Sequence, residues 1–114
     1  MNYIVFDLEW NQCPYGKGQE NERIPFEIIE IGAVKLNSER QIIDQYQVLI
    51  QPRVYKKLHH RTREIIQMDM KLLEREGIPF YRAVKEFLKW CGEDAIFCSW
   101  GNSDLLELQR NMKY

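Results

Sequence analysis

Tyr3–Glu9, with the sequence YIVFDLE, alternates apolar and polar positions and predicts the strand around which the fold is built. One face of this strand carries Ile4, Phe6 and Leu8. The other face carries Asp7 and Glu9, whose carboxylates leave the strand roughly 6.5 Å apart and repel one another. A bound divalent cation makes such a pair favourable, and hard oxygen ligands select Mg²⁺ or Mn²⁺. The alternative is a pair that faces solvent or lies beside lysines.

Two more strands are predicted after a polar loop at about residues 11–23. Residues 28–36 are apolar on both faces, as in a central strand, and residues 42–50 alternate as in a half-buried strand. Short links between the three strands indicate an antiparallel meander. Beyond Pro52 the period becomes helical. Helices are predicted at residues 56–76 in one or two pieces, at 79–91 and at about 103–113, with a short strand at 95–100. The predicted fold class is α/β, a mixed sheet with flanking helices.

The composition is that of one globular domain, expected to span residues 1–114, with 45% hydrophobic and 29% charged residues. The net charge of -1 excludes a strongly basic nucleic-acid-binding domain but allows a local basic patch. No apolar run approaches the roughly 18 residues that a membrane span needs, so no membrane partner is expected. The cysteines have no CxxC spacing and are expected to be buried thiols of a cytoplasmic protein. They are Cys13, Cys91 and Cys98.

Asp104 adds a third carboxylate to the Asp7 and Glu9 pair. It follows the short strand 95–100 and begins the last predicted helix, and that strand is expected to lie beside the first one. A helix-start carboxylate favoured by the helix dipole is the structural alternative for Asp104, and both roles are compatible.

Taken in order, these segments resemble the DEDD, or DnaQ-like, 3′–5′ exonuclease family. Phe6–Glu9 resembles its first motif, Glu27–Val34 its second-strand signature, and Val48–Pro52 the strand that ends in a proline turn. Gly101–Asp104 resembles the second catalytic motif. The similarity covers essentially the whole chain and is greatest to the ERI-1 and KapD-type exoribonuclease branch.

The resemblance implies a ribonuclease H-like fold and hydrolysis of nucleotides from a 3′ end with two Mg²⁺ or Mn²⁺ ions. It implies that Asp7 bridges both ions, that Glu9 holds one ion and positions the attacking water, and that Asp104 binds the second ion. Two cations about 3.5–4 Å apart stabilise charge on both the attacking and the leaving oxygen.

The sequence departs from the family pattern at a third motif, a histidine general base followed by a fourth metal-binding aspartate. The sequence given stops at Tyr114, and His59 and His60 precede Asp104, so neither is assigned as the base. We expect the domain to lack its C-terminal strand and helix. The chain is then the N-terminal part of a longer exonuclease, borrows the missing part from a second chain, or binds without cutting. A homodimer through the exposed edge of the incomplete domain is an expected consequence.

Four residues are predicted to contact substrate. Trp10 and Asn11 follow the first motif, where the family meets the terminal nucleotide, and Trp10 can stack on a base or belong to the core. Arg61 and Arg63 belong to a run of five Lys and Arg, with two histidines and no acid, at residues 53–63. A solvated helix start is the alternative for that run.

The predicted function is therefore metal-dependent 3′–5′ exonuclease activity on single-stranded nucleic acid, RNA rather than DNA because of the branch resemblance alone. A catalytically silent module that binds nucleic acid or protein on the same fold is the alternative. Another metal-dependent nuclease or phosphotransferase of this architecture is a third reading. Mn²⁺ binding that depends on Asp7 separates the enzymes from the silent module.

Overall fold

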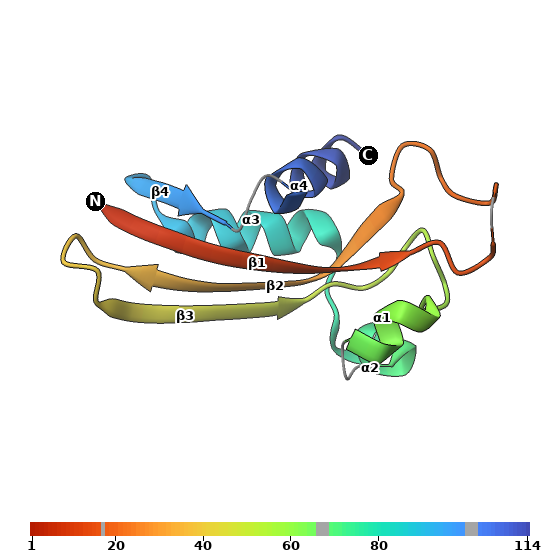
Figure 1. Cartoon of the computed structure of the whole chain (residues 1–114). Helices are drawn as coiled ribbons and strands as arrows, with labels where there is room; N and C mark the ends of the chain where they lie inside the picture. The colour runs from red at the N-terminus through yellow and green to blue at the C-terminus, as the bar shows by residue number, and fades with distance from the viewer. Residues whose placement is uncertain (17, 66–68, 100–102) are drawn as a thin grey trace.

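One mixed sheet forms the centre of the structure (Figure 1), a computed structural model that describes residues 1–16, 18–65, 69–99 and 103–114. Within those residues the sheet has four strands in the order β3-β2-β1-β4. They are β1 (Asn2–Gln12), β2 (Phe26–Leu36), β3 (Ile42–Leu49) and β4 (Ala95–Cys98). The first three pair antiparallel and β4 runs parallel to β1. The predicted meander and the return of a fourth strand to the first are both confirmed.

The helices lie in two places. They are α1 (His60–Ile65), α2 (Met70–Glu76), α3 (Phe80–Cys91) and α4 (Ser103–Lys113). Figure 1 shows α3 and α4 along the sheet and α1 and α2 together near one end of it. Within the described ranges, no helix is long and apolar enough to cross a membrane.

The predicted elements differ from the observed ones mainly at their ends. β1 continues past Glu9 to Gln12 because β2 stays paired with it there, across a bulge between Glu9 and Trp10. The helical segment predicted at residues 56–76 forms two helices, and the second begins at Asp69, whose carboxylate accepts the Leu72 N–H at 2.8 Å. The strand predicted at residues 95–100 is observed at Ala95–Cys98, and Trp100 lies outside the described residues.

The core lies between the sheet and α3. Ile4, Phe6 and Leu8, the predicted buried face of β1, are at most 4% exposed. Phe6 packs against Phe87 of α3 with ring centroids 6.3 Å apart. Burial of each such side chain contributes about 1.5–3 kcal/mol, so this face fixes which way β1 is turned. Asp7 and Glu9 must therefore point to the opposite side.

Edges and thiols follow the expectations in part. β4 is an edge of the described sheet, and Phe97 on it is 48% exposed. The homodimer expected from such an edge stays a prediction. All three cysteines are free, with Cys13 and Cys91 buried and Cys98 half-buried.

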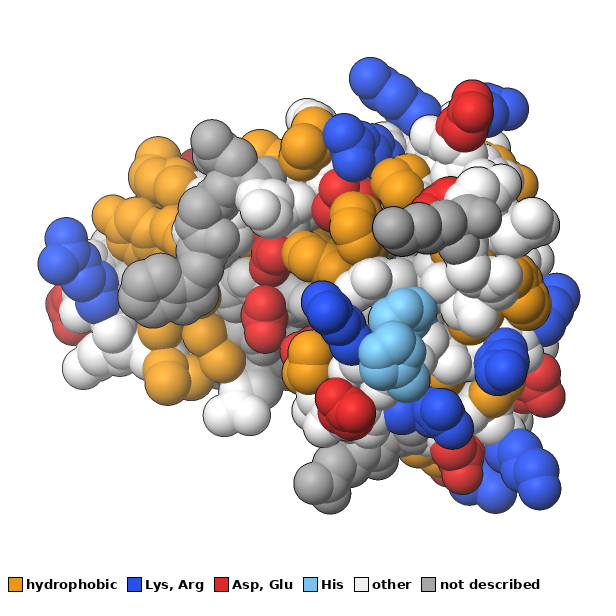
Figure 2. All heavy atoms as spheres, turned by 45° about the vertical axis from the view of Figure 1, so that its right-hand side comes forward, with side chains coloured by type: hydrophobic (Ala, Val, Ile, Leu, Met, Phe, Trp, Pro, Cys, Tyr) orange, Lys and Arg blue, Asp and Glu red, His pale blue; other side chains and the backbone are white. Residues whose placement is uncertain are grey.

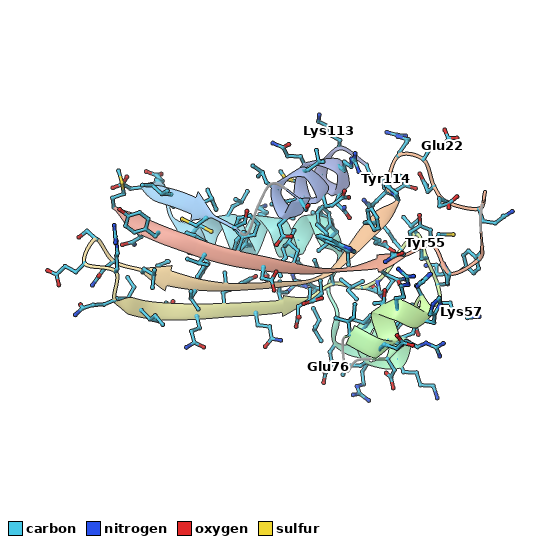
Figure 3. All side chains as sticks on the ribbon, viewed as in Figure 1. Glu22, Tyr55, Lys57, Glu76, Lys113 and Tyr114 are labelled. Atoms are coloured by element: carbon cyan, nitrogen blue, oxygen red, sulfur yellow. The ribbon has the colours of Figure 1, made fainter. Side chains whose placement is uncertain are left out.

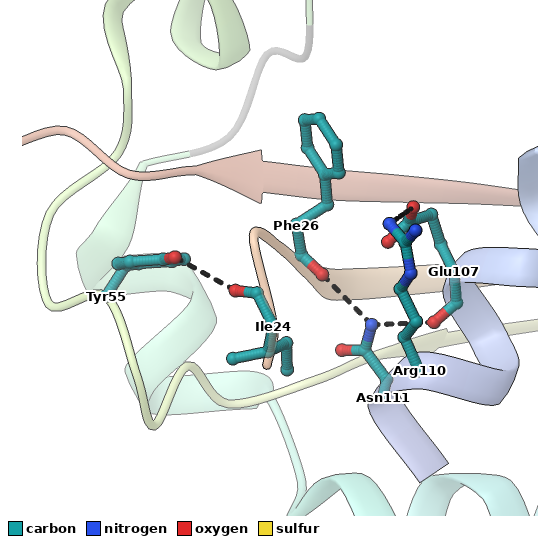
Figure 4. Close-up of polar contacts among 6 residues, drawn as sticks. All are labelled: Ile24, Phe26, Tyr55, Glu107, Arg110 and Asn111. Atoms are coloured by element: carbon teal, nitrogen blue, oxygen red, sulfur yellow. Dashed lines mark hydrogen bonds and ion pairs between the residues drawn. The ribbon is translucent and has the colours of Figure 1, made fainter. Parts of the chain in front are cut away.

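Asn111 attaches α4 to the start of β2 (Figure 4). Its side chain is 2% exposed, its Oδ1 accepts the Ile28 N–H at 3.0 Å, and its Nδ2 donates to the Phe26 carbonyl at 2.9 Å. The same Nδ2 donates to the Glu107 carbonyl one turn earlier. One amide thereby fixes the helix against the sheet, and with it the position of Asp104 at the helix start.

We expect Asn111→Ala to lower the free energy of unfolding, at about 1–3 kcal/mol for each buried backbone group left without a partner. Two groups, the Ile28 N–H and the Phe26 carbonyl, lose their partner. Urea unfolding followed by circular dichroism measures the loss. Met112→Ala, at an exposed position next along the helix, is the matched control and should change little. Equal stability of the two variants would contradict this role for Asn111.

Candidate active site

Asp7 and Glu9 of β1 each stand opposite a residue of β2 in the antiparallel pairing. Asp7 is exposed and faces Gly32 of β2, which has no side chain to cover it. Glu9 is half-buried and pairs with Glu30. Asp7 is therefore open to solvent, whereas Glu9 stands beside another acid, Glu30. The sequence alternation predicted that Asp7 and Glu9 share one face of the strand.

Asp104 reaches the same place from the other end of the chain. It is 8% exposed in the first turn of α4, and its Oδ2 accepts the N–H of Leu8 at 3.3 Å. Among the described residues, the last pair between β1 and β4 is Val5 with Cys98, three positions before Leu8. A hydrogen bond over 96 positions of sequence thus brings Asp104 to the residue between Asp7 and Glu9.

The three carboxyl groups interact electrostatically. Burial raises the pKa of Asp104, the Leu8 hydrogen bond opposes the rise, and the charge of Asp7 and a hydrogen bond with it add to it. Burial also raises the pKa of Glu9, followed by the charges of Asp7, Glu30 and Asp104. A bound cation would offset these charges and lower both pKa values.

Glu30 adds a fourth carboxylate at the margin of the site. Its Oε2 accepts a hydrogen bond from Gln47 of β3 at 2.5 Å. Because it stands opposite Glu9 on the neighbouring strand, its main effect is to add negative charge there. It can support the site from outside rather than join Asp7 and Asp104.

The donor chemistry of the site fits a hard divalent cation, since carboxylate oxygens are the ligands that Mg²⁺ and Mn²⁺ prefer. In the described part of the chain, no three His, Cys, Asp or Glu side chains converge closely enough to hold one ion together. An ion here would take one or two carboxylates and complete its coordination with water or a phosphate, as Mg²⁺ commonly does.

A small pocket of about 190 Å³ lies beside Glu9, between β1 and α1. Trp10, Gln12, Thr62 and Ile65 are among the residues that line it. The Trp10 ring also packs on Phe26, with centroids 5.8 Å apart, so Trp10 packs against the core, and its stacking on a base stays a prediction. Of the three carboxylates, Glu9 alone is among the residues that line this pocket.

Asn11 has a different place from the one predicted for it. It is fully buried, its Nδ2 donates to the Lys57 carbonyl at 3.0 Å, and its Oδ1 accepts the His59 N–H at 2.9 Å. Both ends of the amide are engaged with backbone. Asn11 therefore positions the 57–59 segment and does not offer its side chain to a ligand.

The two predicted arginines differ in position. Arg63 lines a larger pocket together with Lys57, His59 and His60, whereas Arg61 is exposed and does not line it. The prediction missed Lys57 and both histidines as members of one surface. The signal was present in the acid-free run at residues 53–63, but the sequence could not show which of its side chains converge.

A buried acid, Glu107, was also missed. It is 5% exposed on α4, one turn after Asp104, and its Oε1 pairs with Arg110 at 2.8 Å (Figure 4). Its Oε2 has no hydrogen-bond partner among the described residues. Only its helical spacing from Asp104 marked it in the sequence.

Comparison with solved structures identifies the fold. The chain superposes on the nuclease domain of 3′hExo, a DEDDh family member solved with bound rAMP, with a TM-score of 0.78 and 20% identity over 98% of this chain. A structure of 3′-end recognition of a histone mRNA stem-loop by a 3′-exonuclease gives 0.77 and 21% over 98%. Cell-death related nuclease 4 gives 0.75 and 16% over 98%. The fold is that of these nucleases.

The predicted ribonuclease H-like mixed sheet is confirmed by these likenesses. The chain spans 58%, 52% and 39% of the three structures, respectively. No protein-family model matches the sequence, and no curated protein matches it.

Neutralising Asp7 should stabilise the protein when no cation is present. Raised pKa values mean that Glu9 and Asp104 bind protons more tightly in the folded than in the unfolded state. Their contribution to stability is present at low pH and is lost as pH rises above their ordinary values, 4.5 for Glu9 and 3.8 for Asp104. Asp7→Asn removes a charge that causes part of this loss.

We expect Asp7→Asn to unfold at a higher temperature than the wild type at pH 7 in EDTA. This difference in unfolding temperature should become smaller toward pH 4. Thermal unfolding followed by circular dichroism measures it. Glu39→Gln, at an exposed carboxylate of the β2–β3 turn, is the charge-matched control and should show no such difference. A wild type as stable as Asp7→Asn at pH 7 would show that the carboxylates do not strain one another.

Proposed function

We propose that this chain is the N-terminal, cation-binding part of a DEDD-type 3′–5′ exonuclease that hydrolyses single-stranded nucleic acid, RNA in preference to DNA. The observation that carries the proposal is the hydrogen bond from Leu8 to Asp104, which joins the two predicted motifs at one point of the sheet. The fold likeness to DEDDh 3′-exonucleases supports it. The free cysteines are consistent with a reducing, cytoplasmic location.

Asp7, Glu9 and Asp104 are proposed to hold two divalent cations, Mg²⁺ or Mn²⁺. Such ions stabilise charge on the attacking and leaving oxygens of a phosphodiester. Asp7 is the exposed carboxylate and the best placed to contact both ions and substrate. Glu9, with its raised pKa, is placed to orient an attacking water and to take a hydrogen bond from it. Asp104 is positioned beside Asp7 by the Leu8 N–H, which its Oδ2 accepts.

In the proposed reaction a water oxygen attacks the terminal phosphorus and the bond from phosphorus to the 3′ oxygen breaks. The attacking water gives up a proton to the general base, the 3′ oxygen of the preceding nucleotide takes up a proton, and a nucleoside 5′-monophosphate is released. The pocket of Trp10 and Thr62 beside Glu9 would take the terminal base. His59 and His60 line the neighbouring pocket and not this one, so the general base and the fourth carboxylate are proposed to come from residues other than these 114.

The preference for RNA rests on the kind of protein that shares the fold. One such nuclease was solved with rAMP, and another with the stem-loop of a histone mRNA. A single-stranded 3′ end also suits the site, because a terminal phosphodiester must reach carboxylates that lie on a sheet face.

A catalytically silent binding module on the same fold is the second candidate. It is favoured by the observation that, in the part of the structure described, no three ligand side chains converge on one point. Such a module would bind nucleic acid without cutting it, and its affinity would not depend on a divalent cation.

Incubation with a 5′-labelled single-stranded RNA in Mn²⁺ is expected to give a ladder that shortens from the 3′ end. Because Asp7 contacts both ions in the proposal, Asp7→Ala should slow the reaction by at least about a hundredfold, equivalent to about 2.7 kcal/mol of transition-state stabilisation. EDTA should abolish it. A DNA strand of the same sequence, run in parallel, should be degraded more slowly.

Glu39→Ala, which removes an exposed carboxylate of the β2–β3 turn, is the matched control and should retain full activity. Cleavage that survives Asp7→Ala would rule out this site as the source of activity. Binding of the RNA without any shortening, with or without Mn²⁺, would favour the silent module.

A further inference from the structure

A larger pocket of about 570 Å³ opens at the end of β1, between the 13–25 loop and α1. Its floor includes Pro14 and Phe26, and its rim is formed by the side chains of Lys57, His59, His60 and Arg63. Figure 3 shows Lys57 at this end of the sheet, on the segment that leads into α1. A hollow of this size holds one ligand of nucleotide dimensions, since small-molecule pockets span roughly 300–1,000 Å³.

The rim is basic although the whole chain is not. Four of its side chains are Lys, His, His and Arg, and Glu20 is the one acid among the lining residues. Figure 2 shows the two histidines surrounded by basic side chains, with acidic side chains close by on the same face. With both histidines neutral, Lys57 and Arg63 outweigh Glu20, so the pocket lining is net positive in a chain whose net charge is -1. Positive charge attracts a phosphate group.

The rim is held in place by buried contacts. The Asn11 side chain makes hydrogen bonds to the backbone of Lys57 and of His59. The segment that carries the rim is therefore attached to the C-terminal end of β1, two residues after Glu9. His59 Nδ1 accepts the Arg61 N–H at 3.1 Å, which leaves Nε2 as the hydrogen-bond donor of the ring. The ring stacks on His60 with centroids 4.2 Å apart. Because the His59 ring is already held in place, its Nε2 can donate to a phosphate with little further loss of side-chain conformational entropy.

This basic pocket continues from the candidate active site. Gln12 lines both the basic pocket and the smaller pocket beside Glu9. Glu9 and Gln12 are three residues apart on β1, roughly 10 Å along a strand. A chain that places its end phosphate at the carboxylates would therefore pass the basic rim about one nucleotide further from that end.

We propose that the basic pocket binds the phosphodiester backbone of a single strand on the 5′ side of the phosphate held at Asp7 and Glu9. This inference rests on the proposed function for its orientation, and it adds the class of substrate: a strand with several unpaired nucleotides at its 3′ end. Lys57 and Arg63 contact phosphate, His59 donates from Nε2, and Phe26 lies under the base.

The test measures binding without cleavage. Fluorescence anisotropy in EDTA compares a 5′-labelled RNA dinucleotide with a labelled octanucleotide, over a range of salt concentrations. The wild type should bind the octanucleotide more tightly, and Lys57→Ala/Arg63→Ala should weaken that binding about tenfold or more. Its salt slope should fall by about 1.4, because each phosphate neutralised on a single strand contributes about 0.7 to the slope. Dinucleotide binding should change much less.

Lys85→Ala/Lys89→Ala removes the same charge from the exposed face of α3 and is the matched control. An equal loss in both double variants would mean that overall charge, and not the pocket, binds RNA, and would overturn the inference. An unchanged salt slope in Lys57→Ala/Arg63→Ala would overturn it as well. Circular dichroism of each variant confirms that it is folded. Because no hydrolysis is needed, the result stands even where the nuclease assay is negative, so the two proposals fail separately.

Discussion

The hydrogen bond from the Leu8 N–H to Asp104 Oδ2 is the contact on which the candidate site depends. It joins the backbone of β1 to a carboxylate of α4, and the described pairs of β4 with β1 run from Asn2 to Val5, before Leu8. The rest of the fold prepares it. Burial of the apolar face of β1 determines which of its side chains point away from the core, and the hydrogen bonds of Asn111 hold α4 against β2. This one hydrogen bond thus brings Asp104 of α4 close to Asp7 and Glu9 of β1.

That group is unfavourable in the absence of a counter-ion. Burial and mutual repulsion raise the pKa of Glu9 and of Asp104, although Asp104 begins a helix, where the dipole favours a negative charge. A fold shaped for stability alone would place a neutral or basic side chain at one of these positions. The unfavourable interactions are concentrated where β1, β2 and α4 meet, and the proposed cation would offset them. A few residues away the sign of the surface reverses at the basic pocket, so phosphate and cation can be held side by side.

Much of this arrangement could be predicted from local pattern. Alternation in Tyr3–Glu9 placed Asp7 and Glu9 on one face, and the order of strands and helices predicted a mixed sheet in which Asp104 returns to β1. The resemblance to DEDD exonucleases supplied the fold name, which the structural likenesses confirm. Local pattern could not predict contacts between distant segments. Asn11 reads as a surface residue after the motif, but its amide is buried against the backbone of residues 57 and 59. In the same way, the run of basic residues at 53–63 does not reveal that Lys57 and Arg63 line one pocket while Arg61 does not.

The most direct test of the central claim, that Asp7, Glu9 and Asp104 together form a cation site, is a Mn²⁺ titration of the whole chain followed by electron paramagnetic resonance. Asp104→Asn is the informative variant, because an amide oxygen can still accept the Leu8 N–H while the charge is lost. The account predicts that the wild type binds Mn²⁺ and that Asp104→Asn and Asp7→Asn each weaken binding at least about tenfold, with both variants folded. Equal Mn²⁺ affinity in the wild type and both variants would contradict it.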